Sequence, residues 1–136
     1  MDDRGIDGRG NDSFEYMEDR LKARTRAFAI RVFKLCRSLE SDEQGRIVGR
    51  QLMRSASSVA ANYRAVCRCR SHADFVAKLS IVVEEIDESA FWIEFVADIG
   101  LMKQDRVEGV LQEANELLAI FAKSQHTARR NAAGAK

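Results

Sequence analysis

The sequence has no proline, and aromatic residues make up only 7% of its 136 positions. Proline removes a backbone donor and clashes with the preceding helical turn, so its absence favours long uninterrupted helices. No apolar run approaches the roughly 20 residues that a membrane-spanning helix needs. The opening segment, MDDRGIDGRGND, lacks the apolar stretch of a secretory signal. Three cysteines, an odd number, argue against a disulfide scaffold. We therefore expect a cytoplasmic protein that does not enter a membrane.

Four segments carry apolar residues at intervals of three and four, the spacing of one helix face. The length of the chain is that of one domain. Helices joined by short connections predict an all-α fold, an antiparallel up-down-up-down four-helix bundle. We expect the bundle over residues 13–123, with a flexible N-terminal tail at 1–12 and a flexible C-terminal tail at 124–136. The expected helices span about 13–39, 45–70, 73–98 and 103–123.

Helix-boundary residues support this division. Asp12 or Ser13 can accept a backbone N–H and so begin the first helix. Ser71, followed three residues later by Asp74, resembles a capping box at the start of the third helix. Gly100 can adopt the left-handed conformation that ends a helix. These residues are the boundary signals on which the expected helix limits rest.

The segment RQLMRSASSVAANYRA, residues 50–65, combines small residues with arginines. Its small residues would let another helix approach closely. Asn62 falls on the expected apolar stripe, where a buried amide must find hydrogen-bond partners and thereby fixes helix register. Arg54 is expected to form an ion pair with Glu85 or Glu88. We predict a structural polar clamp made by Arg54, Asn62, Glu85 and Glu88.

The net charge of +1 conceals two halves of opposite sign. Residues 20–70 contain 13 Lys and Arg against three acids, whereas residues 71–125 contain 11 acids against four Lys and Arg. Such asymmetry indicates either an anionic partner for the basic half or contact between the two halves, within one chain or between neighbouring chains. The near-neutral total favours the second interpretation slightly.

Several arginines repeat every four residues, a spacing that would present a row of cations to a phosphate backbone. Aromatic residues that could stack on bases are nearly absent among them, Tyr63 being the exception. The alternative is a solvated face, or one side of a charge match with Glu84, Asp87, Glu94 and Asp98 of another subunit. The candidate nucleic-acid-binding residues are Arg20, Arg24, Arg46, Arg50, Arg64 and Arg68.

Other clusters point less clearly to chemistry. Cys67, Cys69 and His72 form C-x-C-x-x-H, but a structural zinc site needs four ligands, and Cys36 or His126 would have to supply the last. The acids near residues 84–88 lack the Glu-x-x-His pairs of di-metal bundles. We predict no catalytic residues, no metal and no cofactor. Three aromatic residues are expected at the end of the bundle or in an oligomer seam, where such residues are enriched: Phe91, Trp92 and Phe95.

The segments RQLMRSASSVAANYRA, DFVAKL and EEIDESAFWIEFVADIGLM follow one another through the second and third expected helices. Their order and spacing resemble a bacterial four-helix-bundle family, first met as a protein encoded in an intervening sequence of 23S ribosomal RNA. The family's Ile-Ala-Glu-Gly after the asparagine is replaced here by Tyr63, Arg64, Ala65 and Val66, so properties of that Glu and Gly do not carry over. The similarity covers about residues 20–122. The matching residues are Gln51, Leu52, Arg54, Ser55, Ala56, Ser58, Val59, Asn62, Asp74, Phe75, Leu79, Glu85, Glu88, Gly100 and Leu101.

The resemblance implies a homopentamer arranged as a ring, without enzymatic activity. A related basic branch serves diversity-generating retroelements and is thought to bind nucleic acid and the reverse transcriptase. Two hypotheses follow for this chain. One is a self-assembling module that associates with RNA or DNA through its basic first and second helices. The other is a protein-partner adaptor or scaffold, whose basic half is neutralised by the acidic half of a neighbouring subunit.

Overall fold

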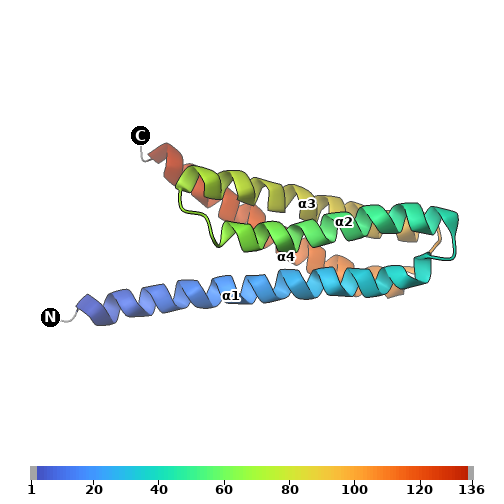
Figure 1. The fold of residues 1–136 in the computed structure, drawn as a ribbon, viewed down its shortest axis with the longest axis horizontal. Helices are drawn as coiled ribbons and strands as arrows, with labels where there is room; N and C mark the ends of the chain where they lie inside the picture. The colour runs from blue at the N-terminus through green and yellow to red at the C-terminus, as the bar shows by residue number, and fades with distance from the viewer. Residues whose placement is uncertain (1–2, 135–136) are drawn as a thin grey trace.

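The computed structural model of the chain describes the backbone of residues 3–134 and the side chains of residues 15–131. Within these residues the chain forms four α-helices, one short 3-10 helix and no strand. Each α-helix runs opposite to the preceding one, so α1 begins and α4 ends at the same end of the bundle (Figure 1). The elements are α1 (Asp3–Cys36), η1 (Arg37–Leu39), α2 (Glu43–Val66), α3 (His72–Asp98) and α4 (Gln104–Gly134).

Helices that are consecutive in the chain pack against one another, and α4 returns to lie beside α1. In the described part of the chain no Cα atom of α1 lies within 8 Å of a Cα atom of α3, and none of α2 lies within 8 Å of one of α4, so these pairs occupy the diagonals. The contact between α1 and α4 is the least extensive of the four. This arrangement confirms the predicted four-helix bundle. None of the helices described here is both long and apolar enough to cross a lipid bilayer.

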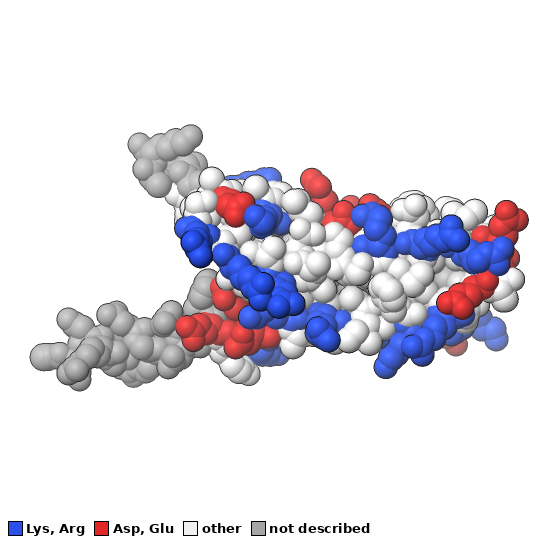
Figure 2. All heavy atoms as spheres, in the orientation of Figure 1, with Lys and Arg blue, Asp and Glu red and all other residues white. Residues whose placement is uncertain are grey.

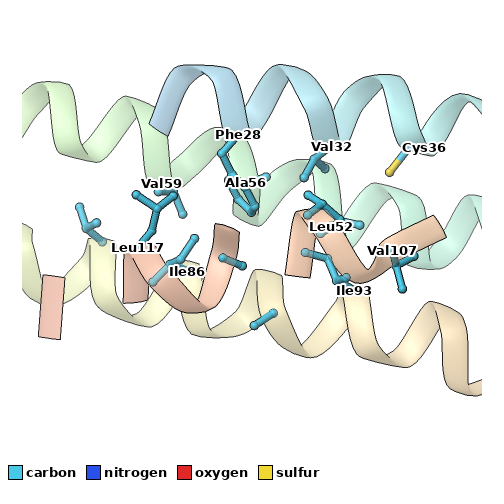
Figure 3. Packing of buried hydrophobic residues seen from close by; sticks show 14 of the residues in the cluster. Phe28, Val32, Cys36, Leu52, Ala56, Val59, Ile86, Ile93, Val107 and Leu117 are labelled. Carbon is cyan, nitrogen blue, oxygen red and sulfur yellow. The ribbon is translucent and has the colours of Figure 1, made fainter. Parts of the chain in front are cut away.

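The core lies along the axis of the bundle, where side chains from all four helices meet (Figure 3). Phe28 and Val32 of α1 are fully buried, as are Leu52 of α2, Ile86 of α3 and Leu117 of α4. Burial of one such side chain contributes about 1.5–3 kcal/mol relative to exposure. The apolar spacing in the sequence therefore identified the face that each helix buries.

One position of the predicted stripe on α2 is wrong. Asn62 is only half-buried, and the neighbouring Tyr63 takes the core position with 6% of its surface exposed. The Tyr63 ring lies 5.0 Å from the ring of Phe121 on α4, centroid to centroid. The Tyr63 side chain fills the space between α2 and α4 that the smaller side chain of Asn62 would leave open. Because the Tyr63 ring is buried, it is not available to stack on bases.

The helix ends also differ from the prediction. Helix α1 begins at Asp3, so residues 3–12, which were expected to form a tail, are helical. The predicted cap at Asp12 or Ser13 does not begin the helix, and no proline in this segment interrupts it. Helix α2 ends at Val66 rather than near Arg70, because the amides of Arg68 and Cys69 bond three residues back and tighten the chain into a turn.

Helix α4 continues to Gly134 through most of the expected C-terminal tail. Its added turns pack on α3, where Ala128 is buried. The Nε2 atom of His72 lies 2.9 Å from the carbonyl oxygen of Ala128, and Gln125 donates a 2.7 Å hydrogen bond to the hydroxyl of Ser80. These contacts with α3 explain why the helix extends past Lys123.

The predicted boundaries of α3 are confirmed. The Ser71 hydroxyl accepts a 3.1 Å hydrogen bond from the amide of Asp74, and Gly100 has the positive φ of 79° expected after the helix. Helix α2 has a cap of its own, Asp42, which accepts a 3.4 Å bond from the amide of Gly45. A Cβ at Gly45 would lie 2.4 Å from the carbonyl oxygen of Leu39, so only glycine fits where the first turn of α2 meets η1.

Candidate nucleic-acid interface

Helix α2 carries three of the predicted arginines, Arg46, Arg50 and Arg64, and the fourth, Arg68, lies in the turn that follows Val66. Arg46 and Arg64 are eighteen residues apart, a separation of about five helical turns, or about 27 Å, so they lie on the same side of the helix. Arg50 lies about one turn from Arg46 on that side. All four side chains are exposed. We call Arg46, Arg50, Arg64 and Arg68 the α2 arginine row.

The cations on the face that carries α1 and α2 gather in separate clusters, with uncharged surface between them (Figure 2). Ser57, Ala60 and Ala61 occupy the middle of α2 between the two ends of the α2 arginine row. The row is therefore interrupted by a stretch of small side chains rather than continuous along the helix.

The α2 arginine row makes no ion pair within the described part of the chain, and one member, Arg46, donates a 2.9 Å hydrogen bond to the carbonyl oxygen of Glu40. Arg24 is different, because its Nη2 lies 2.6 Å from Glu113 and 3.6 Å from Glu116 of α4. The hydrogen bond with Glu113 raises the pKa of Arg24. Helix α4 thus neutralises this predicted contact residue inside the chain.

The last predicted residue, Arg20, extends over the ring of Tyr16, with the guanidinium carbon 5.8 Å from the ring centroid. Both side chains are exposed. A cation–π contact at such a site is worth about 0.5–1 kcal/mol. Arg20 therefore keeps its charge accessible, although it is on a different helix from the α2 arginine row.

A groove of 440 Å³ lies between α1 and α2. Three cationic residues line it, Lys22 and Arg26 of α1 and Arg64 of α2. The other residues that line it have small side chains. We call it the α1–α2 groove, and the small residues that line it are Ala23, Ala29, Ser57, Ala60 and Ala61. Lys22 and Arg26 were not among the predicted contact residues, although they have the same four-residue spacing as the predicted arginines.

The polar clamp assembles between α2 and α3. The Nη1 atom of Arg54 lies 3.2 Å from Glu85, and its Nη2 atom bonds to Glu88, so Arg54 bridges both predicted partners. The indole N–H of Trp92 also donates to Glu88, at 3.1 Å. Asn62 is not part of this cluster, because its amide donates to the carbonyl and the hydroxyl of Ser58 on its own helix.

The environment of Glu88 has two opposing effects on its pKa. Partial burial acts to raise the pKa, but the hydrogen bonds from Arg54 and Trp92 outweigh burial and leave the pKa below its ordinary value. The first hydrogen bond also raises the pKa of Arg54. The clamp is thus an ion pair held in its charged form, which is consistent with a structural rather than a catalytic role.

The three predicted seam aromatics form one cluster on α3. The ring of Phe91 lies 4.9 Å from that of Trp92 and 5.7 Å from that of Phe95, and Trp92 and Phe95 are 5.5 Å apart. Trp92 and Phe95 are half-buried, whereas Phe91 is 52% exposed. The cluster therefore presents one large apolar side chain at the surface.

The described residues contain no group of three or more His, Cys, Asp and Glu side chains placed to hold a metal ion. Cys36 is buried, and burial raises the pKa of its thiol to about 11. Cys69 donates to the carbonyl of Ala65, at 3.4 Å, and His72 stacks on Phe75. The C-x-C-x-x-H residues are thus engaged in local packing where α2 turns into α3.

The topology, the clamp and the basic face of α1 and α2 define this chain as a four-helix-bundle protein without an evident catalytic centre among its described residues. Residues 19–123 match the family described as 23S rRNA-intervening sequence protein. The match covers most of the chain, and the chain therefore belongs to that family.

The solved structures include a close fold relative. It is a protein with unknown function from the S23 ribosomal protein family of Bacteroides thetaiotaomicron, 25% identical, with a TM-score of 0.72. The similarity covers 77% of this chain and 97% of that chain. No curated protein matches the sequence.

Proposed function

We propose that the chain is a non-enzymatic, self-assembling bundle that associates with nucleic acid through the α2 arginine row. The observation that carries this proposal is that all four arginines of the row are exposed and none is ion-paired by the described residues. Guanidinium groups bind phosphate oxygens in a bidentate manner, and contacts to phosphates supply affinity without reading sequence.

The surroundings of the row favour binding to the backbone over binding to bases. Single-strand binding sites usually place aromatic side chains where bases can stack on them. Tyr63 is buried, and the positions between the two ends of the row are small. We therefore expect RNA or DNA to be bound with little sequence preference.

Fluorescence anisotropy tests the proposal. Structured RNA and duplex DNA are titrated with the protein from about 50 to 300 mM salt, where up to four phosphate contacts per chain on duplex DNA give a slope of log K against log salt no steeper than about −3.6 per chain. The double variant Arg46→Glu/Arg50→Glu should bind at least tenfold more weakly at low salt.

The matched control is Lys103→Glu/Arg106→Glu, which changes the net charge equally at exposed positions near the start of α4. The control should bind like the natural chain. Equal losses in both variants, or no binding by the natural chain at the lowest salt, would overturn the proposal.

The assembly expected from the family resemblance is a homopentamer, and light scattering should then give a mass five times that of the 15.3 kDa chain. An assembly also supports the second candidate function, a scaffold or adaptor for a protein partner. That candidate is favoured by the exposed Phe91 on an acidic helix. It predicts an assembled protein that binds neither RNA nor DNA.

A further inference from the structure

We propose that the α1–α2 groove receives α3 of a second copy of this chain, so that copies associate head to tail. The inference rests on the self-assembly included in the proposed function, and it names the two surfaces that meet. One surface is the cation-lined groove of small residues. The other is the exposed side of α3.

The groove is a gap in the packing of the bundle. Small residues on the α3 side of α2 are covered, since Ser55 is fully buried. In contrast, Ala61 and Ser57 are exposed, and Ala23 of α1 is exposed opposite them. Small side chains keep this space of 440 Å³ open instead of filling it. A groove of this shape can admit a large side chain carried by another helix.

The charges around the groove limit what can enter it. Lys22, Arg26 and Arg64 are the charged residues that line it, and all three are exposed. Lys22 lies 3.4 Å from Asp19, an exposed pair of the kind that contributes little. The occupant should therefore combine an apolar side chain for the small residues with acidic groups for the three cations.

The exposed side of α3 has this composition. No Lys or Arg occurs between Lys78 and Lys103. Glu84, Phe91 and Asp98 recur every seven residues and so lie on one side of the helix. Phe91 is 52% exposed. We define the acidic α3 face as Glu84, Asp87, Phe91, Glu94 and Asp98, all of them exposed.

The two surfaces carry opposite charges on either side of a position for an apolar side chain. Asp87 and Glu94, which flank Phe91, are separated by about 10 Å along α3. On the other side, Lys22 and Arg26 lie about 6 Å apart along α1, with Arg64 across the groove on α2. Phe91 can thus enter the alanine-lined space while acids on both sides of it approach the cations.

Two other occupants fit less well. A phosphate backbone would neutralise the cations but leave the alanine surface in contact with water. A symmetric pairing of two acidic α3 faces would bury the exposed aromatic ring but bring like charges together, which is costly at an interface. A second copy presenting α3 to the groove satisfies both the apolar and the charged groups.

The groove and the acidic α3 face belong to different surfaces of one chain, because α1 and α3 lie diagonally across the bundle. A contact between unlike surfaces is heterologous and generates a closed ring or an open filament rather than a two-fold dimer. Arg46 and Arg50 do not line the groove, so they stay free in the assembly. The half of the α2 arginine row nearest η1 then remains available to nucleic acid.

Charge reversal on each surface tests the pairing. In the groove variant, Lys22 and Arg26 become glutamate (K22E/R26E), and in the α3 variant, Asp87 and Glu94 become lysine (D87K/E94K). Each variant should lose the assembly and sediment as a monomer, with helix content by circular dichroism unchanged since all four residues are exposed. A chain that carries all four substitutions should assemble again, because the two introduced acids would then face the two introduced lysines.

A third variant, Phe91→Ser, should weaken assembly at least tenfold without reversing any charge. The Arg46→Glu/Arg50→Glu variant should assemble normally and lose only nucleic-acid binding. The inference is overturned if the groove variant still assembles or if the variant with all four substitutions stays monomeric. If the natural chain is monomeric, both the self-assembly in the proposed function and this pairing are wrong. If the natural chain assembles but does not bind nucleic acid, only the proposed nucleic-acid binding is wrong.

Discussion

The hydroxyl of Ser89 on α3 lies 2.8 Å from the hydroxyl of Ser55 on α2, and neither side chain has any exposed surface. Ser55 in turn donates a 3.1 Å hydrogen bond to the carbonyl oxygen of Leu52. The polar atoms of both serines are therefore satisfied inside the core, and their small size lets α2 and α3 approach closely. This contact is the tight helix–helix packing that the small residues of segment 50–65 predicted.

Replacement of Ser55 separates its size from its hydrogen bond. Ser55→Ala should lower the free energy of unfolding by no more than about 1 kcal/mol, because Ser89 keeps a 2.9 Å bond to the carbonyl of Glu85. Ser55→Leu should cost about 1–3 kcal/mol, since a larger side chain overpacks the contact. Urea unfolding measures both. The exposed control Ser38→Leu should be nearly neutral, and an equal cost at both serines would show that the contact is not close-packed.

The polar clamp predicts how stability depends on pH. The folded pKa of Glu88 is lowered, so the unfolded chain binds this proton more tightly, and the stabilisation is present at neutral pH and lost as pH falls through the folded pKa. The free energy of unfolding should therefore decline from about pH 5 to 3 more steeply in the natural chain than in Glu88→Gln. Urea unfolding at each pH measures this. The exposed Glu108→Gln should retain the natural slope, and parallel curves for all three proteins would contradict the assignment.

Substitution of Tyr63 distinguishes a structural role of this side chain from a direct contact with nucleic acid. Tyr63→Ala should destabilise the bundle by about 3–5 kcal/mol, because it removes a buried ring that packs on Phe121. Tyr63→Phe keeps the ring and should leave the affinity for RNA and DNA unchanged. Thermal unfolding and anisotropy titration give the two readouts. Weaker binding by a stably folded Tyr63→Phe variant would mean that the side chain reaches the ligand after all.

The end of α4 is predicted to stabilise the start of α3. A chain that ends at Lys123 loses the bonds from Gln125 and Arg129 to Ser80 and the contact of His72 with Ala128. We expect a loss of about 1–3 kcal/mol and faster amide hydrogen exchange over residues 72–80. The α2–η1 end of the bundle should exchange as before. Unchanged exchange at 72–80 would show that the last turns of α4 contribute nothing to α3.

Helix periodicity made the bundle predictable, because each helix buries one face and the apolar residues repeat accordingly. Ser71 and Gly100 were equally informative, since capping and a positive φ depend on local backbone geometry. The family resemblance supported the placement of the second and third helices, which carry its motifs. It gave no information on contacts made by residues outside those motifs.

The misplaced features depend on contacts between residues distant in sequence. Asn62 and Tyr63 follow Val59 by three and four positions, and either spacing continues a helical stripe, so only the partner across the bundle, Phe121, decides which one is buried. The pairing of Arg24 with Glu113 depends in the same way on how α4 returns beside α1. Lys22 and Arg26 became candidates only once the separation of α1 and α2 was known.

The glycine in the first turn of α2 sets how closely that helix approaches the residues that follow α1. The carbonyl of Leu39 leaves no room for a Cβ at Gly45, so Gly45→Ala must shift the start of α2 relative to the end of α1. We expect that shift at the η1 end of the bundle, twelve or more residues along α2 from Ser57, Ala60 and Ala61 of the α1–α2 groove. A single methyl group at position 45 therefore probes how the two helices are joined, while every residue that lines the groove stays the same.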